Sequence, residues 1–132
     1  MKIDILEFNE EGMKRVYEND KWLVGIKNWK PANDITGIDC LEKHNLTDEL
    51  FVLIAGMCTL VTASEVDGLM VFDKVVMEPH KVYNIPKTMW HNTITSKDTK
   101  MILIEDSSSS MENSNLYMLS DQELIDVREL AK

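Results

Sequence analysis

Two segments of the sequence carry side chains that bind metal ions or move protons. In the first, Glu42 and His44 are two residues apart, so on an extended strand they would share one face. A turn over residues 45–48 would then bring Glu49 alongside them. The second segment supplies His91. Imidazole nitrogen and carboxylate oxygen together suit Fe, Mn, Zn, Ni or Cu, so these residues are candidate metal ligands.

The positions of Glu49 and His91 within their segments indicate that both face an interior. Glu49 begins an alternating row with Phe51 and Leu53, and His91 begins a similar row with Thr93. A carboxylate at the end of an inward apolar row is costly to bury unless it meets a metal, a base or a hydrogen-bond donor. The sequence therefore predicts a polar site at the edge of an apolar core.

The elements that must position these residues are predicted to be strands. Short runs rich in Val, Ile, Thr and aromatic residues are separated by Gly, Pro, Asn, Asp or Lys, a spacing typical of a sandwich or closed barrel rather than of βαβ units. The runs cover residues 22–29, 49–55, 57–63, 69–77, 82–85, 91–95 and 100–105. A polar stretch of low complexity, residues 107–115, predicts a loop after the last of them.

A short helix is predicted near each end of the chain. Over residues 9–17, Asn9 is a candidate N-cap and three apolar residues follow at helical spacing. Over residues 120–130, Ser120 and Glu123 form a capping-box pattern ahead of a second helical repeat of apolar residues.

Composition limits the classes of partner and the cellular location. The chain has 132 residues, 44% of them apolar, and a formal net charge of −9. Such a surface repels nucleic-acid phosphates and anionic lipids, so we expect neither as a partner. No apolar run approaches a membrane span, and the acidic N-terminal segment does not suit a signal peptide, which favours the cytoplasm. Cys40 and Cys58 are too few for a disulfide framework.

Two motifs resemble those of the cupin superfamily. The pattern H-x4-E-x6-G, formed by His44, Glu49 and Gly56, is similar to the first cupin motif, and P-x4-H, from Pro86 to His91, is similar to the second. The resemblance implies an all-β fold, a cupin-type jelly-roll β-barrel, with the short terminal helices added. It also implies that residues 1–132 form a single cupin domain of the small bacterial type.

The chain departs from the cupin pattern at the first metal ligand. Glu42 occupies the place of the first histidine, while His80 and Thr88 replace two glycines of the second motif. The ligand set implied by the resemblance is then His44, Glu49, His91 and Glu42. Two nitrogens and two carboxylates suit a divalent ion, Mn, Fe, Zn or Ni, and the added charge favours Mn²⁺ or Fe²⁺. The alternative is a metal-free pair of hydrogen-bonded histidines, with Glu42 turned to the barrel mouth and paired with a surface base such as Lys43.

The resemblance implies a small-molecule site without naming a reaction. One hypothesis is a metal-dependent isomerase, epimerase, lyase or oxygenase acting on a small sugar or polar metabolite, with Glu42 and Glu49 as catalytic carboxylates. The alternative is a metal-free module that binds a small ligand without catalysis, and a third possibility is a barrel that only dimerises. Whether the chain is an enzyme is left open. We expect a homodimer, with the apolar run at residues 22–29 as a candidate exposed edge.

Overall fold

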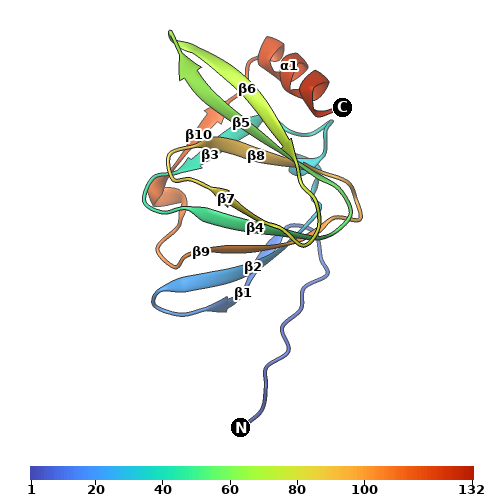
Figure 1. Cartoon of the computed structure of the whole chain (residues 1–132), viewed down its shortest axis with the longest axis vertical. Helices are drawn as coiled ribbons and strands as arrows, with labels where there is room; N and C mark the ends of the chain where they lie inside the picture. The colour runs from blue at the N-terminus through green and yellow to red at the C-terminus, as the bar shows by residue number, and fades with distance from the viewer.

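Ten strands form two antiparallel sheets that face each other in a jelly-roll barrel (Figure 1). A computed structural model describes all 132 residues. The first sheet has the order β1 (Met13–Glu18), β2 (Trp22–Asn28), β9 (Lys100–Asp106), β4 (Glu49–Ala55) and β7 (Val82–Ile85). The second has the order β10 (Ser114–Met118), β3 (Cys40–His44), β8 (Trp90–Thr95), β5 (Cys58–Val66) and β6 (Leu69–Val76). The predicted all-β jelly-roll class is confirmed.

The larger of two buried apolar clusters fills the interior between the sheets and ends where the polar side chains begin. Its buried members are Leu23, Phe51, Leu53, Cys58, Leu60, Met77, Ile85, Met101 and Leu103. Phe51 and Leu103 lie at the boundary, because they also line a polar pocket. On β4 the inward row Leu53, Phe51 and Glu49 runs from this core into the pocket, as the alternation of a strand requires.

The glycine that ends the first motif has a steric reason to be glycine. Gly56 follows β4 with φ +76°, a conformation that L side chains rarely adopt. A Cβ atom there would lie 2.5 Å from Thr99 Cα. The turn after β4 therefore needs glycine both for its backbone angle and for the close approach of Thr99.

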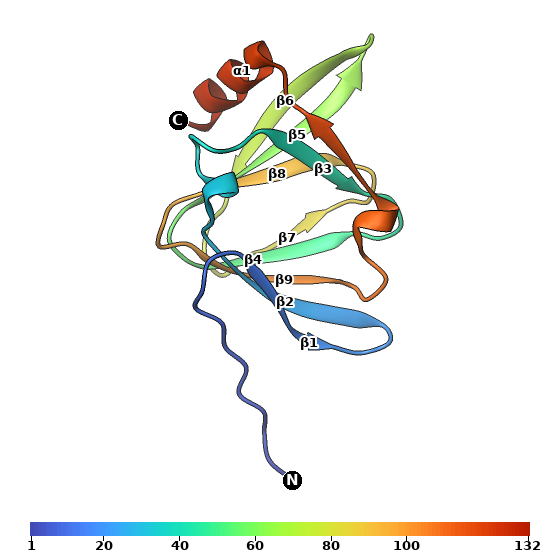
Figure 2. The ribbon, with the colours of Figure 1, turned by 180° about the vertical axis from the view of Figure 1, so that it is seen from behind.

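The C-terminal helix is confirmed with its cap. Helix α1 (Asp121–Ala131) begins after Ser120, whose hydroxyl accepts a hydrogen bond from the Glu123 backbone N–H, while the Glu123 carboxylate accepts one from the Ser120 N–H. Val127 is fully buried where the helix packs outside β5 and β6 (Figure 2). No helix has the length and apolarity needed to cross a membrane.

The predicted N-terminal helix is wrong, because residues 13–18 form strand β1. This strand pairs antiparallel with β2 from Met13↔Lys27 to Glu18↔Leu23, and its register shifts between Arg15 and Tyr17. Met13 lines the interior pocket, whereas Val16 and Tyr17 line a groove on the outer face. The apparent helical spacing therefore comes from two faces of a bulged strand.

The expected free edge at residues 22–29 is also wrong. Strand β2 lies between β1 and β9 and is paired on both sides. The edges of the sheets are β1 and β7 in one and β10 and β6 in the other. Strand β10 was not predicted from the sequence. It includes the end of the expected 107–115 loop, which also contains a 3-10 turn, η2 (Met111–Asn113).

Candidate functional site

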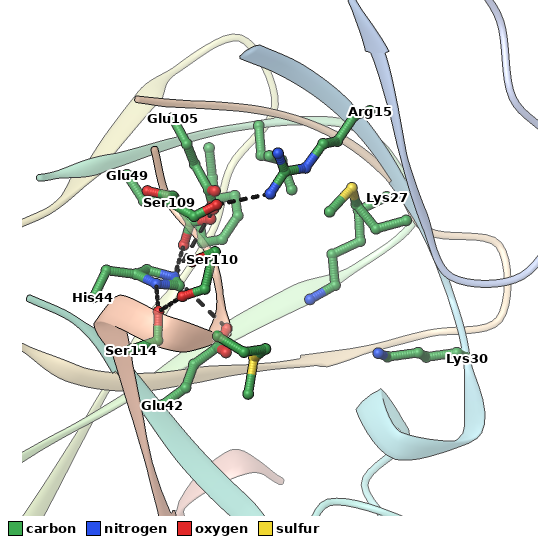
Figure 3. Close-up of a pocket in the computed structure, with 14 residues that line it drawn as sticks. Arg15, Lys27, Lys30, Glu42, His44, Glu49, Glu105, Ser109, Ser110 and Ser114 are labelled. Carbon is green, nitrogen blue, oxygen red and sulfur yellow. Dashed lines mark hydrogen bonds and ion pairs between the residues drawn. The ribbon is translucent and has the colours of Figure 1, made fainter. Parts of the chain in front are cut away.

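A polar pocket of about 300 Å³ opens between the two sheets (Figure 3). Strands β1, β2, β3, β4 and β9 contribute its walls, and the segment between β9 and β10 closes one side. Two cross-strand pairs fix the carboxylates. Glu42 lies opposite His91 in the second sheet, and Glu49 lies opposite Glu105 in the first. His44 completes the group at the end of β3.

Hydrogen bonds fix the tautomer of His44. Its Nδ1 lies 2.8 Å from Ser114 Oγ, and the Ser114 hydroxyl donates to the Ser110 carbonyl at 2.7 Å. Since the hydroxyl proton is already used, Nδ1–H is the donor to Ser114. In the neutral ring Nε2 therefore carries a lone pair, and this buried nitrogen has no hydrogen-bond partner.

Nε2 of His44 faces three carboxylates. The nearest is Oε1 of Glu49 at 3.5 Å, and Oε1 of both Glu42 and Glu105 lies at 3.9 Å. None of these oxygens can donate to the nitrogen while the carboxylates are ionised. The lone pair of His44 is thus aimed at a cluster of acceptors.

His91 is held in a similar way, with its ring centroid 5.5 Å from that of His44. Its Nδ1 lies 3.0 Å from the Met89 carbonyl, which can only accept, so Nδ1–H is the donor. Its Nε2 lies 3.2 Å from Glu49 Oε1. The side chain is 2% exposed, so this ring lies behind Glu49 and does not line the pocket. Both histidines direct Nε2 to one carboxylate oxygen.

The centre of this group needs positive charge, either from protons or from a metal ion. Two imidazole lone pairs and the surrounding carboxylates repel one another unless protons or a metal ion lie between them. The donor atoms of Glu42, His44 and His91 lie within 4.8 Å of one another, as do those of His44, Glu49 and Glu105. In addition, both rings donate Nδ1–H to a protein oxygen, the usual arrangement of histidines that ligate through Nε2. The donor set therefore fits a divalent metal ion.

Comparison with solved structures identifies the fold. No family model and no curated protein sequence matches the chain. A Pac13 variant from Streptomyces, solved with uridine, matches with a TM-score of 0.63 at 11% identity over 93% of this chain and 98% of that one. KdgF from Halomonas sp. matches with a TM-score of 0.53 at 14% identity, covering 80% and 90%. A cupin-2 domain protein from Shewanella frigidimarina matches with a TM-score of 0.50 at 20% identity, covering 75% and 84%.

The chain has the cupin fold. Likeness at these identities establishes the fold alone, because one fold hosts many different chemistries. Within the cupin barrel, the structure brings together all four residues singled out from the sequence, His44, Glu49, His91 and Glu42. Glu42 is half-buried and makes no ion pair with a lysine, because Lys43 lies over the Trp90 ring instead, with Nζ 4.6 Å from the ring centroid.

The ionisable side chains of this site shift one another's pKa values. Burial alone would raise the pKa of Glu49, but hydrogen bonds and charge from His44 and His91 overcome it and hold that pKa at about 2. Protonation would turn Nε2 of His44 into a donor facing Glu49. That hydrogen bond, together with the charges of Glu49 and Glu42, raises the pKa of His44 although burial opposes it. Without a metal, the site therefore favours a protonated His44 beside an ionised Glu49.

Sequence reasoning missed Glu105 and the two serines beside His44. Glu105 ends the inward row Met101, Leu103, Glu105 on β9, the same pattern that pointed to Glu49, so the signal was present. Ser114 carried no such signal. It reaches His44 because the two residues are direct partners in the β10–β3 ladder, and no local pattern predicts that pairing.

The side of the pocket across from His44 is cationic, and sequence reasoning missed it as well. Arg15, Lys27 and Lys30 extend into it from β1, from β2 and from the segment after β2 (Figure 3). Arg15 is engaged, with one guanidinium nitrogen 3.0 Å from Glu18 Oε2 and the other donating to the Ser109 carbonyl at 2.7 Å. Burial lowers the pKa of Lys27, although Glu49 and Glu42 oppose the shift.

Proposed function

We propose that this cupin binds a divalent metal ion, Mn, Fe, Zn or Ni, through His44, Glu49 and His91, with Glu42 as the fourth ligand. We also propose that it acts on a small polar metabolite as an isomerase, epimerase or lyase. The observation that carries the proposal is the buried Nε2 of His44, which has no hydrogen-bond partner and faces carboxylate oxygens. Glu105 is the alternative fourth ligand, because its carboxylate lies as far from His44 Nε2 as that of Glu42.

The chain's own residues divide the work between holding and proton transfer. A bound divalent ion would supply Lewis acidity that polarises a carbonyl or hydroxyl oxygen of the ligand. Glu49, with a pKa near 2 and 4% exposure, stays ionised and holds the two rings in orientation. Where Glu105 is the fourth ligand, Glu42 is left free to act as a base. It is half-buried and lines the open pocket, so of the two predicted catalytic carboxylates it is better placed to take a proton from a ligand carbon.

The solved neighbours support small-molecule chemistry on this barrel by analogy only. Pac13 is described as a nucleoside dehydratase built on a beta-barrel, and its variants were solved with uridine. Dehydration is a lyase reaction that needs a base and an acid near one carbon–oxygen bond. The pocket offers His44, Glu42 and Glu105 for such roles.

A metal-free binding module is the second candidate. It is favoured by the same cluster in its protonated form, since His44 and His91 can each donate Nε2–H to Glu49 when charged. In that state the centre is satisfied without an ion, and the pocket would hold a polar ligand without turning it over. Metal-dependent stability separates the two candidates.

The experiment is a thermal melt of protein stripped with EDTA and then supplied with Mn²⁺, Fe²⁺, Ni²⁺ or Zn²⁺. An ion that binds only the native state raises the melting temperature in proportion to RT ln(1 + [L]/Kd). The variants His44→Ala and His91→Ala should each lose that rise. His80→Asn is the matched control, because His80 lies exposed in a turn with φ +71°, which asparagine tolerates.

Two results would reject the metal proposal. One is a wild-type protein that purifies without metal and gains no stability from any of the four ions. The other is a rise that persists in both His44→Ala and His91→Ala, which would place the ion elsewhere. Either result leaves the metal-free module as the better account.

We also propose a homodimer formed through the N-terminal arm, residues 1–9. The first residues of the arm extend away from the barrel and expose Met1, Ile3 and Ile5, whereas the Phe8 carbonyl is held to the barrel by Asn28 and Lys100 (Figures 1 and 2). An outer groove of about 270 Å³ on the first sheet is lined only by apolar side chains, those of Leu6, Val16, Tyr17, Trp22, Val24, Ile26 and Ile102. The arm of a second copy has the apolar side chains that such a groove would cover.

Sedimentation tests this assembly. Wild type should sediment as a dimer, and Ile3→Asp with Ile5→Asp should shift it toward the 15.2 kDa monomer. Wild type that sediments only as the monomer at micromolar concentration would reject the dimer. We place the protein in the cytoplasm, where its two free thiols, Cys40 and Cys58, would stay reduced. Compartment fractionation tests that placement.

A further inference from the structure

Two lysines of the pocket have no protein partner. Lys27 and Lys30 direct their ammonium groups into the cavity from the side across from His44 and Glu42 (Figure 3). The ion pairs of the chain involve Arg15, Lys81, Lys132 and the two site histidines, and neither pocket lysine is among them. Both lysines therefore have their donors available to a ligand.

The environment of Lys27 is unfavourable for an isolated ammonium group. The side chain is half-buried, burial lowers its pKa, and the nearby positive charge of Lys30 lowers it further. Glu49 and Glu42 oppose these effects only at a distance, since neither carboxylate is within ion-pair range of it. An anionic group placed between the two lysines would offset both the burial and their mutual repulsion.

We propose that the pocket binds a small organic acid, with a carboxylate held between Lys27 and Lys30 and the rest of the molecule facing His44 and Glu42. This inference rests on the proposed function, since it names the ligand class of the same pocket. The volume of about 300 Å³ suits a molecule of metabolite size. The overall charge of −9 makes this cationic end a local feature rather than a general property of the surface.

A carboxylate fits this end better than a phosphate. Phosphate sites usually combine a bidentate arginine or a cradle of backbone N–H groups. The only arginine that lines the pocket is Arg15, and its guanidinium group is already held by Glu18 and the Ser109 carbonyl. Lys27 and Lys30 act as two point charges. Three carboxylates, those of Glu42, Glu49 and Glu105, also line the cavity and would repel a doubly charged group more than a singly charged one.

Calorimetric titration tests the proposal with three probes. Butyrate carries a single carboxylate, butyramide has nearly the same size without charge, and inorganic phosphate represents the other oxyanion class. The protein is stripped with EDTA, which is then dialysed away because it is itself a carboxylate ligand. Each titration is made without metal and with Mn²⁺. Butyrate should bind and butyramide should not.

The variants Lys27→Met and Lys30→Met remove each charge and keep an unbranched side chain. Each should weaken butyrate binding about tenfold, the loss expected for one charge-assisted hydrogen bond. Lys14→Met is the matched control, because Lys14 is an exposed lysine of the adjacent strand that does not line the pocket. It should leave the affinity unchanged.

The outcomes separate this proposal from the metal proposal. Butyrate binding that is lost in the lysine variants while Mn²⁺ still raises their melting temperature supports both. The same lysine dependence without any metal effect supports the organic acid and rejects the metal. No butyrate binding to wild type, equal binding of butyramide, or tighter binding of phosphate overturns the organic-acid assignment, whatever the metal result.

Discussion

The two ends of the pocket are built differently. At the histidine end, ring orientations are fixed by short hydrogen bonds, from His44 to Ser114 and from His91 to the Met89 carbonyl. At the lysine end, Lys27 and Lys30 extend long side chains into the cavity without a partner. A fixed set of metal-binding atoms suits a small ion with strict coordination geometry, whereas flexible ammonium groups suit a ligand that varies in shape. The difference agrees with our proposals that the histidine end binds a metal ion and that the lysine end binds a carboxylate.

The largest effect should come from removing the carboxylate that both histidines share. Glu49→Ala breaks a buried charge group and leaves two rings without a partner, so we expect a loss of about 3 to 5 kcal/mol in the free energy of unfolding. Urea denaturation measures this. The control Glu78→Ala removes the exposed carboxylate that pairs with Lys81 at 2.7 Å and should leave stability nearly unchanged. Equal losses of stability in Glu49→Ala and Glu78→Ala would mean that the buried carboxylate has no special role in stability.

The next effect is a pH window of stability in metal-free protein. The lowered pKa of Glu49, about 2 against 4.5, gives a stabilisation present above pH 4.5 and lost as the pH falls toward 2. The raised pKa of His44 gives one present below pH 6.5 and lost as the pH rises through the raised value. Stability should therefore be highest between these limits. Denaturation across this range should show the fall at both sides in wild type, and His44→Ala should lose the alkaline fall.

A smaller change tests how the histidine end of the pocket keeps the orientation of the His44 ring. Ser114→Ala removes the acceptor of the His44 Nδ1–H bond without touching a proposed ligand. Loss of such a supporting partner typically weakens metal affinity by about 10- to 100-fold. Competition with a metal indicator measures it, and Ser114→Thr, which keeps the hydroxyl, should restore most of the affinity. Unchanged affinity in Ser114→Ala would mean that the ring needs no such support.

The fourth position of the site can be assigned by paired substitutions. Glu42→His should rebuild the common cupin set and shift preference toward Zn²⁺ or Ni²⁺. Glu42→Gln and Glu105→Gln each remove one charge, and the larger loss of metal content, measured by elemental analysis, identifies the ligand. If all three Glu42 and Glu105 variants keep the content and identity of the metal, neither residue is a ligand.

The smallest effect on stability is expected at the lysine end. Lys27→Met removes a desolvated charge whose pKa is lowered by burial, so stability should stay unchanged or rise by no more than about 1 kcal/mol. Thermal melts of wild type and variant measure this. A large loss of stability in Lys27→Met would mean that the lysine serves the fold, and the contrast between the two ends would disappear.

The sequence by itself determined which residues face inward along a single strand and where the C-terminal helix begins. Alternation along β4 placed Glu49 at the end of a buried row, motif spacing selected His44 and His91, and the Ser120 pattern marked the start of α1. These features are local, since strand alternation and capping are set by neighbours in the chain. Together with the resemblance of the two motifs, they sufficed to predict the cupin fold and to select four polar residues that lie close together.

Only the tertiary structure decided which strands meet and where their side chains converge. Ser114 supports His44 because β10 pairs with β3, and Glu105 joins Glu49 because β9 pairs with β4. The bulge of β1 turns Met13 into the pocket and Val16 outward, which local spacing had mistaken for a helix. Pairing register depends on segments far apart in the chain, so the periodicity of one segment cannot reveal it. The same reason applies to the lysine end of the pocket, because Lys27 and Lys30 face His44 and Glu42 only when β2 lies across the pocket from β3.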